Sequence, residues 1–242
     1  MKVAVILPAA GLGTRMGGTP SPERAGTSRK QFMLLNGAPI LLHTIRKFAA
    51  SPLVTEIVVA LRGEDVAWAK DLIDSDGLQK PIRVVVGGDS RHESVENAIS
   101  ALDEDTDLVA VHDAVRPFVD QELIRAVIEE ATATGAAILG IVPVDTVKQV
   151  HRNKIRATIP RDKLVLAQTP QVFRFDLIKK AFAQAKADGF NGTDEASLVE
   201  RLEQVEVSVV PGSDRNIKIT KPTDMELARL FLAGEQESRK AS

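Results

Sequence analysis

The chain has 242 residues, of which 44% are hydrophobic and 26% charged, and its formal net charge is −2. These values are typical of one soluble domain with a sizeable core, and they argue against a protein that binds nucleic acid or a membrane through general positive charge. The sequence contains no cysteine, which excludes disulfides, thiolate metal sites and cysteine nucleophiles and favours a cytoplasmic location.

The first apolar run, residues 2–7, leads directly into a glycine-rich and basic stretch, residues 7–32. We interpret the run as a buried strand rather than a signal peptide, because it offers one basic residue and only about eight apolar positions. Glycines behind a buried strand let backbone N–H groups approach an anion, and Arg15 and Lys30 suit phosphate oxygens. The stretch therefore predicts a phosphate site, against the alternative of a plain turn with solvated charges.

Two common phosphate-binding motifs do not fit this stretch. The dinucleotide fingerprint G-x-G-x-x-G requires a glycine where the chain has Met16, and Arg62 stands where a ribose-binding acid is expected. A P-loop requires a Gly-Lys pair, which the stretch lacks.

The following segments alternate between strand and helix. Short apolar runs at 56–61, 82–88 and 108–113 lack polar alternation, as strands covered on both faces do. Helices with capping residues are predicted at 39–51, 64–77, 91–102, 120–135, near 176–188 and after Thr193, with a further strand at 205–210. This order predicts an α/β protein with a mainly parallel sheet and right-handed crossovers.

The alternation breaks in residues 136–173, which contain no convincing helix. After a strand at 137–142, alternating segments on both sides of the polar tip 151–154 predict a β-hairpin. Because exposed hairpin edges need cover, we interpret about 143–167 as a β-arm for dimerisation rather than a loose excursion.

The last helix is predicted to begin with a capping box formed by Thr223 and Glu226 and to end at Gly234. Residues 235–242 would then be a frayed tail, and residues 1–234 a single domain.

A polar loop follows the run at 108–113. Asp113 and Arg116 stand at a carboxyl strand end, and Pro117 prevents an immediate helix, so the loop is expected to face a ligand. The carboxylate could bind Mg²⁺, its waters or substrate hydroxyls; the alternative is an ion pair that only ties the loop. His112 is expected to pack on the opposite side.

A second glycine turn, residues 87–95, leads into a helix that Asp89 or Ser90 can cap, with Ser94 one turn inside. Such a turn could equally recognise a base through backbone groups. Further polar candidates are Thr146, Arg161, Thr169 and Lys218. Each of these residues alone is a weak signal.

Residues 193–197 are interpreted as an ordinary helix start, where Asp194 and Glu195 favour the helix dipole. The sequence shows no Ser/His/Asp set and no H-E-x-x-H motif, and its histidines lack ligand spacing. With eight Phe, one Trp and no Tyr, it offers no aromatic platform for an oligonucleotide.

Seven stretches combine into one resemblance. They are PAAGLGTRM…KQF, GGDSRHESV, VHDAVRPF, DTVK, PRDKLVLAQTPQVF, TDEAS and NIKIT…D, and they cover about residues 2–232. In these the chain resembles the 2-C-methyl-D-erythritol 4-phosphate cytidylyltransferases of non-mevalonate isoprenoid synthesis. The resemblance implies a Rossmann-like, three-layer nucleotide-diphospho-sugar transferase fold with a twisted sheet, and a homodimer interlocked by the β-arm.

The resemblance also implies an activity, the transfer of CMP from CTP to methylerythritol phosphate with release of pyrophosphate, and Mg²⁺ as cofactor. By position, Arg15 and Lys30 would stabilise charge on the α-phosphate, and Lys218 would help hold the reacting phosphates. Arg161, counted with these three as catalytic, and Thr169 would reach the acceptor phosphate from the other subunit.

The remaining implied roles concern binding. Asp113, Arg116 and Thr146 would bind acceptor hydroxyls or organise the metal, with Asp113 acting through water. The implied CTP-binding set is Pro8, Ala9, Ala10, Gly11, Gly13, Gly88, Asp89, Ser94 and Ala114. An ionised acceptor phosphate is already nucleophilic, so positioning and charge stabilisation would suffice without a general base.

One departure from the family pattern concerns the loop. Fourteen residues separate Arg15 from Lys30, more than the pattern leads us to expect, so Arg24 and Arg29 are alternative cations. Three other functions stay open beside the leading one: a ribitol 5-phosphate cytidylyltransferase, a non-catalytic nucleotide-binding module and a glycosyltransferase on the same fold.

Overall fold

The computed structural model describes residues 1–11 and 29–241, so Gly13, Arg15 and Arg24 lie outside the described residues. Within them, one seven-stranded sheet contains β1 (Val3–Pro8), β4 (Glu56–Leu61), β5 (Ile82–Val86), β6 (Leu108–Val111), β7 (Ala136–Ile141), β10 (Leu166–Arg174) and β11 (Ser208–Pro211). The spatial order is β11-β7-β10-β6-β1-β4-β5. Strand β10 is antiparallel to β6 and β7, and the other pairs are parallel, which confirms the predicted mainly parallel α/β sheet.

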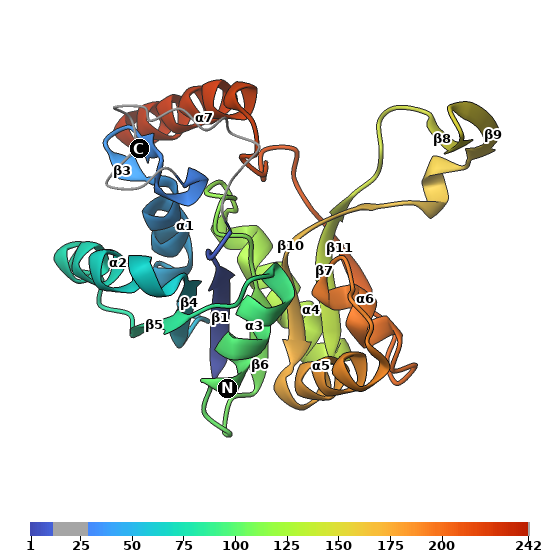
Figure 1. The fold of residues 1–242 in the computed structure, drawn as a ribbon. Helices are drawn as coiled ribbons and strands as arrows, with labels where there is room; N and C mark the ends of the chain where they lie inside the picture. The colour runs from blue at the N-terminus through green and yellow to red at the C-terminus, as the bar shows by residue number, and fades with distance from the viewer. Residues whose placement is uncertain (12–28, 242) are drawn as a thin grey trace.

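Helices cover both faces of this sheet (Figure 1). One face carries α1 (Ile40–Ala49), α2 (Gly63–Ser75) and α4 (Gln121–Thr134), and the other carries α3 (Arg91–Ser100), α5 (Phe175–Asp188) and α6 (Glu195–Glu200). Along β1, Val3, Val5 and Leu7 pack into the first apolar cluster, and Ala4 and Ile6 pack into the second. Successive side chains of a strand point to opposite faces, so a doubly covered strand is apolar throughout.

The chain is next described from Arg29, at the short helix η2 (Lys30–Phe32) and the small hairpin of β2 (Leu34–Leu35) and β3 (Ala38–Pro39). Phe32 is buried in the first apolar cluster and contacts Trp68 of α2 edge to face, with ring centroids 4.8 Å apart. This packing fixes η2 beside the carboxyl ends of the central strands.

The C-terminal helix α7 (Pro222–Ala241) lies beyond the carboxyl ends of the central strands (Figure 1). Two predictions about it are wrong. Asp224, rather than Thr223 with Glu226, completes its first turn, because its carboxylate accepts hydrogen bonds from the Thr220 and Lys221 amides at 2.8 and 3.0 Å.

The second wrong prediction is the frayed tail, because α7 continues past Gly234 to Ala241. Lys47 of α1 binds the Glu235 carboxylate at 2.8 Å, which ties the helix to the domain just beyond the expected end. Nothing at Gly234 forces an end: the chain there keeps helical geometry, and no left-handed cap forms.

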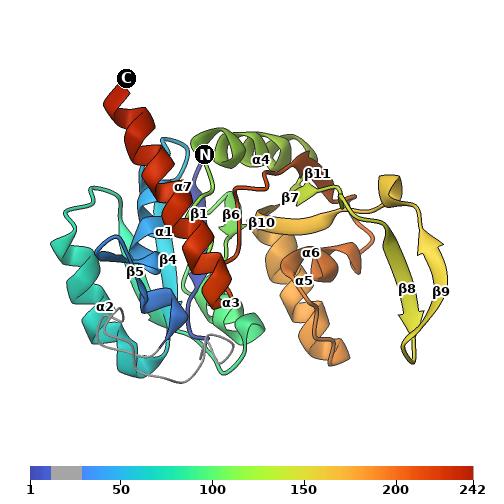
Figure 2. The same ribbon diagram turned by 90° about the horizontal axis from the view of Figure 1, so that it is seen from above.

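The predicted hairpin is present as β8 (Val147–His151) and β9 (Lys154–Ile159), which pair antiparallel. Its tip, Arg152 and Asn153, has φ of 48° and 61°, the left-handed values of the tight turns that suit hairpin twist. The hairpin stands away from the sheet, at the end of the extended segments that leave β7 and return to β10 (Figures 1 and 2).

Candidate functional site

A pocket of about 250 Å³ opens at the carboxyl ends of β1, β5 and β6, where α/β sheets bind their ligands. Its wall contains Pro8, Ala9, Ala10, Gly11, Lys30, Gln31, Gly88, Asp89, Ser90, Arg91, Ser94, Asp113, Ala114, Val115 and Lys218. Every described residue of the CTP-binding set implied by the resemblance is among them. The structure therefore brings into one cavity segments that lie as far apart in the sequence as Pro8 and Lys218.

The first wall of the pocket is the backbone that follows β1. Gln31, only 2% exposed, donates its side-chain amide to the carbonyls of Ala9 and Gly11, and the Ala9 amide bonds the Ala60 carbonyl at 2.8 Å. Residues 9–11 are thus held against η2 as well as against the sheet. Sequence reasoning missed Gln31, although its place next to Lys30 is a signal that could have found it.

The structure also distinguishes the candidate cations at the end of the long loop. Lys30 lines the pocket, whereas the Arg29 side chain is turned away and buried. Arg29 forms ion pairs with Glu64 and Asp65 in the first turn of α2. Lys30, rather than Arg29, is therefore the described cation of this segment that can meet a ligand in the pocket.

The second wall is the glycine turn that precedes α3. Ser90 caps the helix by accepting the Glu93 amide at 3.0 Å, and Glu93 in return accepts the Asp89 and Ser90 amides at 2.8 and 3.0 Å. Ser94 accepts the Gly88 amide at 3.1 Å. These three turn amides therefore bond within the turn itself.

Gly88 is required at its position because the turn is packed tightly on the helix. A Cβ on Gly88 would lie 2.2 Å from the Cβ of Glu93, a distance that no side chain tolerates. The glycine therefore serves close packing here, and the turn approaches the pocket as a rigid edge.

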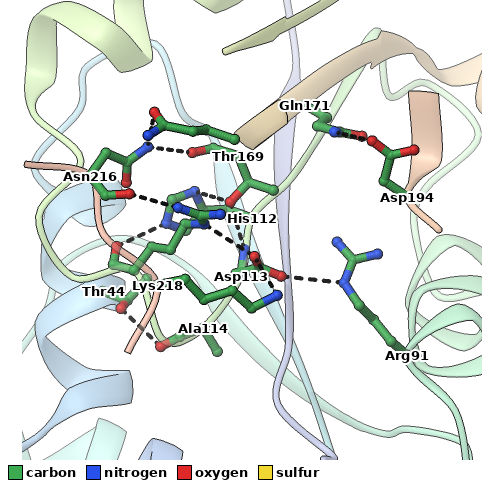
Figure 3. A network of polar contacts seen from close by, with 12 residues as sticks. Thr44, Arg91, His112, Asp113, Ala114, Thr169, Gln171, Asp194, Asn216 and Lys218 are labelled. Carbon is green, nitrogen blue, oxygen red and sulfur yellow. Dashed lines mark hydrogen bonds and ion pairs between the residues drawn. The ribbon is translucent and has the colours of Figure 1, made fainter. Parts of the chain in front are cut away.

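The third wall centres on Asp113, which is 5% exposed (Figure 3). Its Oδ2 accepts Lys218 Nζ at 3.0 Å and Arg116 Nε at 3.2 Å, and its Oδ1 accepts Arg91 Nε at 3.3 Å. Burial by itself would raise the pKa of Asp113, but the Arg91, Lys218 and Arg116 cations outweigh it and hold that pKa well below its usual range. Asp113 is thus a fixed negative charge at the centre of a cationic wall.

Three hydrogen bonds fix the loop that carries Asp113. The Asp113 amide donates to the Thr169 hydroxyl at 3.1 Å, Thr169 lies 3.1 Å from His112 Nδ1, and His112 Nε2 lies 3.0 Å from the Arg116 carbonyl. Burial lowers the pKa of His112 to about 4, so its ring is neutral at pH 7 and can accept at Nδ1 while it donates at Nε2. The expected packed role of His112 agrees with its complete burial and its edge contact with Phe48.

The segment after β11 closes the same wall. Asn216 is completely buried, donates to the Thr169 carbonyl at 2.8 Å, and accepts Arg116 Nη1 at its own carbonyl at 2.7 Å. The Ile219 amide bonds the Val115 carbonyl at 2.9 Å. Lys218 is thereby placed between two anchored residues, which brings it to Asp113 although the two lie far apart in the chain.

The arm residues are not brought to this pocket within one chain. Arg161 and Thr146 are exposed at the base of the arm, where the Arg161 guanidinium donates to the Val144 carbonyl. The resemblance places Thr169 with Arg161 in a partner's site, whereas here the Thr169 side chain is buried beside its own Asp113. Strand β10 passes through the sheet next to β6, which is the physical reason for this difference.

Two acids predicted only as a helix start have a larger role. Asp194 does cap α6, because it accepts the Ser197 amide at 3.1 Å. Glu195, however, is 2% exposed and binds Arg91 of the pocket wall through both oxygens, at 2.5 and 2.9 Å. An acid directly followed by the apolar residues of a short helix was the available signal, and sequence reasoning missed both Glu195 and Arg91.

The described residues hold no group of three or more side chains that could form a metal cage. Asp113 is the acid that points into the cationic wall, and both of its oxygens already accept from cations. The donor set therefore fits Mg²⁺ only as a partner held through water, together with ligand phosphates, which is how proteins commonly hold this ion.

The fold and the pocket define a class: an α/β protein with a cationic ligand pocket at the carboxyl ends of its strands. The family model of the 2-C-methyl-D-erythritol 4-phosphate cytidylyltransferases matches residues 3–234. The chain belongs to this family. Among the described residues, no helix combines the length and the apolar character needed to cross a bilayer.

Relatives and solved structures agree with this assignment. The chain is 67% identical over 239 residues to the cytidylyltransferase of Solibacter usitatus, with 97% of both chains covered, and 51% identical over 238 residues to that of Acidobacterium capsulatum, with 96% and 98% covered. The crystal structure of the Francisella tularensis enzyme matches with a TM-score of 0.78 at 35% identity, covering 95% of this chain and 99% of that one. A 4-diphosphocytidyl-2C-methyl-D-erythritol synthase from Anaerococcus prevotii matches with a TM-score of 0.84 at 29% identity, covering 96% of each.

Proposed function

We propose that the protein transfers CMP from CTP to 2-C-methyl-D-erythritol 4-phosphate, giving CDP-methylerythritol and pyrophosphate in non-mevalonate isoprenoid synthesis. The observation that carries this proposal is the single pocket that joins the described CTP-binding set to Lys30, Asp113 and Lys218. Family membership supports methylerythritol phosphate rather than ribitol 5-phosphate as the acceptor. The lysines and the ionised Asp113 favour an enzyme over a passive binding module.

The proposed chemistry is one in-line displacement at phosphorus. An oxygen of the acceptor phosphate forms a bond to the α-phosphorus of CTP, the bond from that phosphorus to the bridging oxygen breaks, and the electron pair leaves with pyrophosphate. The attacking phosphate is already ionised, so no proton has to be removed from it. Catalysis then consists of orientation and charge stabilisation.

We assign these two tasks to the described residues as follows. Lys30, which enters the pocket beside residues 9–11, stabilises charge on the α-phosphate together with Arg15, which lies outside the described residues. The Lys218 side chain is 35% exposed and forms an ion pair with Asp113, so a phosphate that enters the pocket can bind the Lys218 ammonium group. Arg116 and Asp113 are then the residues that we assign to binding of the acceptor.

Mg²⁺ is part of the proposal. When bound with the triphosphate, it would neutralise phosphate charge and so favour loss of pyrophosphate. Asp113 would contact it through water, because its two oxygens are bound by cations.

We further propose that the protein acts as a homodimer through the arm, in the cytoplasm. Six of the eleven large hydrophobic side chains that are exposed among the described residues lie in 142–166, and Val144 and Ile155 are 78% and 65% exposed. A second copy that covers this arm would remove these apolar surfaces from water. It would also carry Arg161 and Thr146 toward a pocket that they do not reach within their own chain.

The function is tested with purified protein, CTP, Mg²⁺ and methylerythritol phosphate. We expect stoichiometric formation of pyrophosphate and of CDP-methylerythritol, identified by mass spectrometry. CTP binding without turnover would instead support a non-catalytic module, and consumption of a sugar nucleotide without pyrophosphate would support a glycosyltransferase.

A further inference from the structure

Arg91 occupies an unusual position on the pocket wall, between two buried carboxylates. It is the first residue of α3, and its Nε lies 3.3 Å from Asp113 Oδ1 (Figure 3). The end of its guanidinium meets Glu195, with Nη1 and Nη2 at 2.5 and 2.9 Å from the two carboxylate oxygens. Three of its five N–H groups are therefore used by these two acids.

The two contacts of Arg91 differ in strength. The bond to Glu195 is bidentate and short, whereas Asp113 receives one longer bond from Nε. Burial opposes the charge of Arg91, but the two carboxylates outweigh it and raise the pKa of Arg91 above its ordinary value. Arg91 is thus a permanent cation that belongs mainly to Glu195.

Glu195 itself is held from behind. Gln171, 1% exposed on β10, donates to the Asp194 carboxylate at 2.8 Å and accepts the Ala196 amide at 3.0 Å. These bonds fix the residues on both sides of Glu195. The same strand carries Thr169, whose hydroxyl accepts the Asp113 amide, so both carboxylates are anchored to β10.

This arrangement controls how Asp113 shares its charge. Asp113 meets Arg91, Arg116 and Lys218, so one carboxylate faces three cations, and a second anion reduces this excess of positive charge. Glu195 supplies this anion and draws the guanidinium away from Asp113. Without the charge of Glu195, Arg91 would turn more fully to Asp113 than its single bond from Nε now allows, and it would compete with the acceptor for that carboxylate.

We infer that Glu195 is a positioning residue for the acceptor, which acts through Arg91 to keep the Asp113 carboxylate presented to the pocket. The inference rests on the proposed cytidylyl transfer. It gives the TDEAS stretch a role in acceptor binding beyond that of a helix start.

The test is Glu195→Gln, which keeps the shape of the side chain and removes its charge. We expect the KM for methylerythritol phosphate to rise about tenfold, while the KM for CTP changes less than twofold. Glu104→Gln is the matched control, because Glu104 is an 85% exposed partner of Lys179 outside the pocket wall, and it should leave both constants unchanged. Circular dichroism melting shows whether each variant is folded.

A double-variant comparison separates positioning from simple stability. If Glu195 acts through Arg91, then Glu195→Gln added to Arg91→Gln should raise the acceptor KM no further than Arg91→Gln alone. The inference would be overturned if the increases in acceptor KM of the two single variants multiplied in the double variant. It would also be overturned if folded Glu195→Gln had an acceptor KM within twofold of wild type. If Glu195→Gln does not fold, Arg91→Lys, which keeps the charge and loses the fork, must raise the acceptor KM selectively or the inference fails. Absence of turnover in the wild type would refute the proposed function instead.

Discussion

At the scale of single residues, the site is organised by charges and hydrogen bonds that are satisfied before any ligand arrives. Asp113 is buried and ionised because three cations surround it, and its loop is fixed by Thr169 and the neutral ring of His112. Preformed donors and charges lose little energy to reorganisation during a reaction. The wall therefore suits a reaction that depends on charge stabilisation rather than on proton transfer.

His112 gives a prediction about the pH dependence of stability. Its pKa is lowered to about 4 in the folded protein, against roughly 6.5 when unfolded, so between these values the unfolded chain binds more protons. The contribution of His112 is therefore complete above about pH 6.5 and is lost progressively as the pH falls toward 4. By linkage this loss amounts to about 2 to 3 kcal/mol at pH 4.5.

Urea unfolding of wild type and His112→Gln at pH 7 and pH 4.5 checks this prediction. The variant should be less stable at pH 7, but it should lose about 2 to 3 kcal/mol less than wild type on acidification, because glutamine does not titrate. Equal losses in the two proteins would show that the ring is not held neutral by burial.

At the scale of elements, the short helix η2 fixes the positions of Arg29 and Lys30, the first described cations after residue 11. Arg29 is bound by the first turn of α2, Phe32 packs in the core, and Lys30 between them is left facing the pocket. The segment thus separates an anchoring cation from a ligand-facing one.

Replacement of Lys30 and of Arg29 is predicted to have different effects on activity and on stability. Lys30→Ala should lower kcat by about 10² to 10³ with little effect on stability, since it removes one charge from the transition state. Arg29→Ala should instead destabilise the fold by about 3 to 5 kcal/mol, because Asp65 is 2% exposed and would be left as an unpaired buried charge.

Steady-state kinetics and urea unfolding of both variants, with Lys70→Ala on exposed α2 surface as control, provide the measurement. The assignment is contradicted if Arg29→Ala, while folded, loses as much kcat as Lys30→Ala.

Many of the helices, strands and turns could be predicted from the sequence, because strands, caps and glycine turns are local patterns. The apolar runs, Ser90 before α3, the start of α6 near Asp194 and the hairpin tip at 151–154 all follow from rules that act over a few residues. The end of α7 was missed, since the contact of Glu235 with Lys47 joins segments 188 residues apart.

The candidate site was predicted in part for the same reason. Glycine turns and the polar loop after β6 are recognisable from a few neighbouring residues, and the family pattern indicates Lys30 and Lys218. Arg91, Glu195 and Asn216 depend on contacts between distant segments, for example 104 residues between Arg91 and Glu195. No spacing rule connects such residues, so their contacts with one another are visible only in the fold.

At the scale of the whole molecule, the pocket and the arm lie in different parts of the chain, and the proposed dimer would bring them together. The loops that follow the strands hold the charges around Asp113, and the arm stands away from the sheet (Figure 2). Arg161 is exposed at the base of this arm. In this account each site uses the pocket of one subunit and the arm of the other.

Mixed dimers test this division. Arg15→Ala and Arg161→Ala proteins should each be nearly inactive alone. Mixing them with subunit exchange should restore up to about a quarter of the wild-type activity, because about half of the dimers are then mixed and each mixed dimer has one intact site of two. Light scattering would test whether the protein is a dimer, and labelled subunits would show whether exchange has taken place. No recovery after confirmed exchange would mean that Arg15 and Arg161 of one site come from the same subunit.

The identity of the reaction is tested most directly by pyrophosphate release by purified protein with CTP, Mg²⁺ and one acceptor at a time. We expect rapid release with 2-C-methyl-D-erythritol 4-phosphate, a kcat/KM at least about 10²-fold lower with ribitol 5-phosphate, and no release without an acceptor. Turnover with ribitol 5-phosphate alone would contradict this expectation.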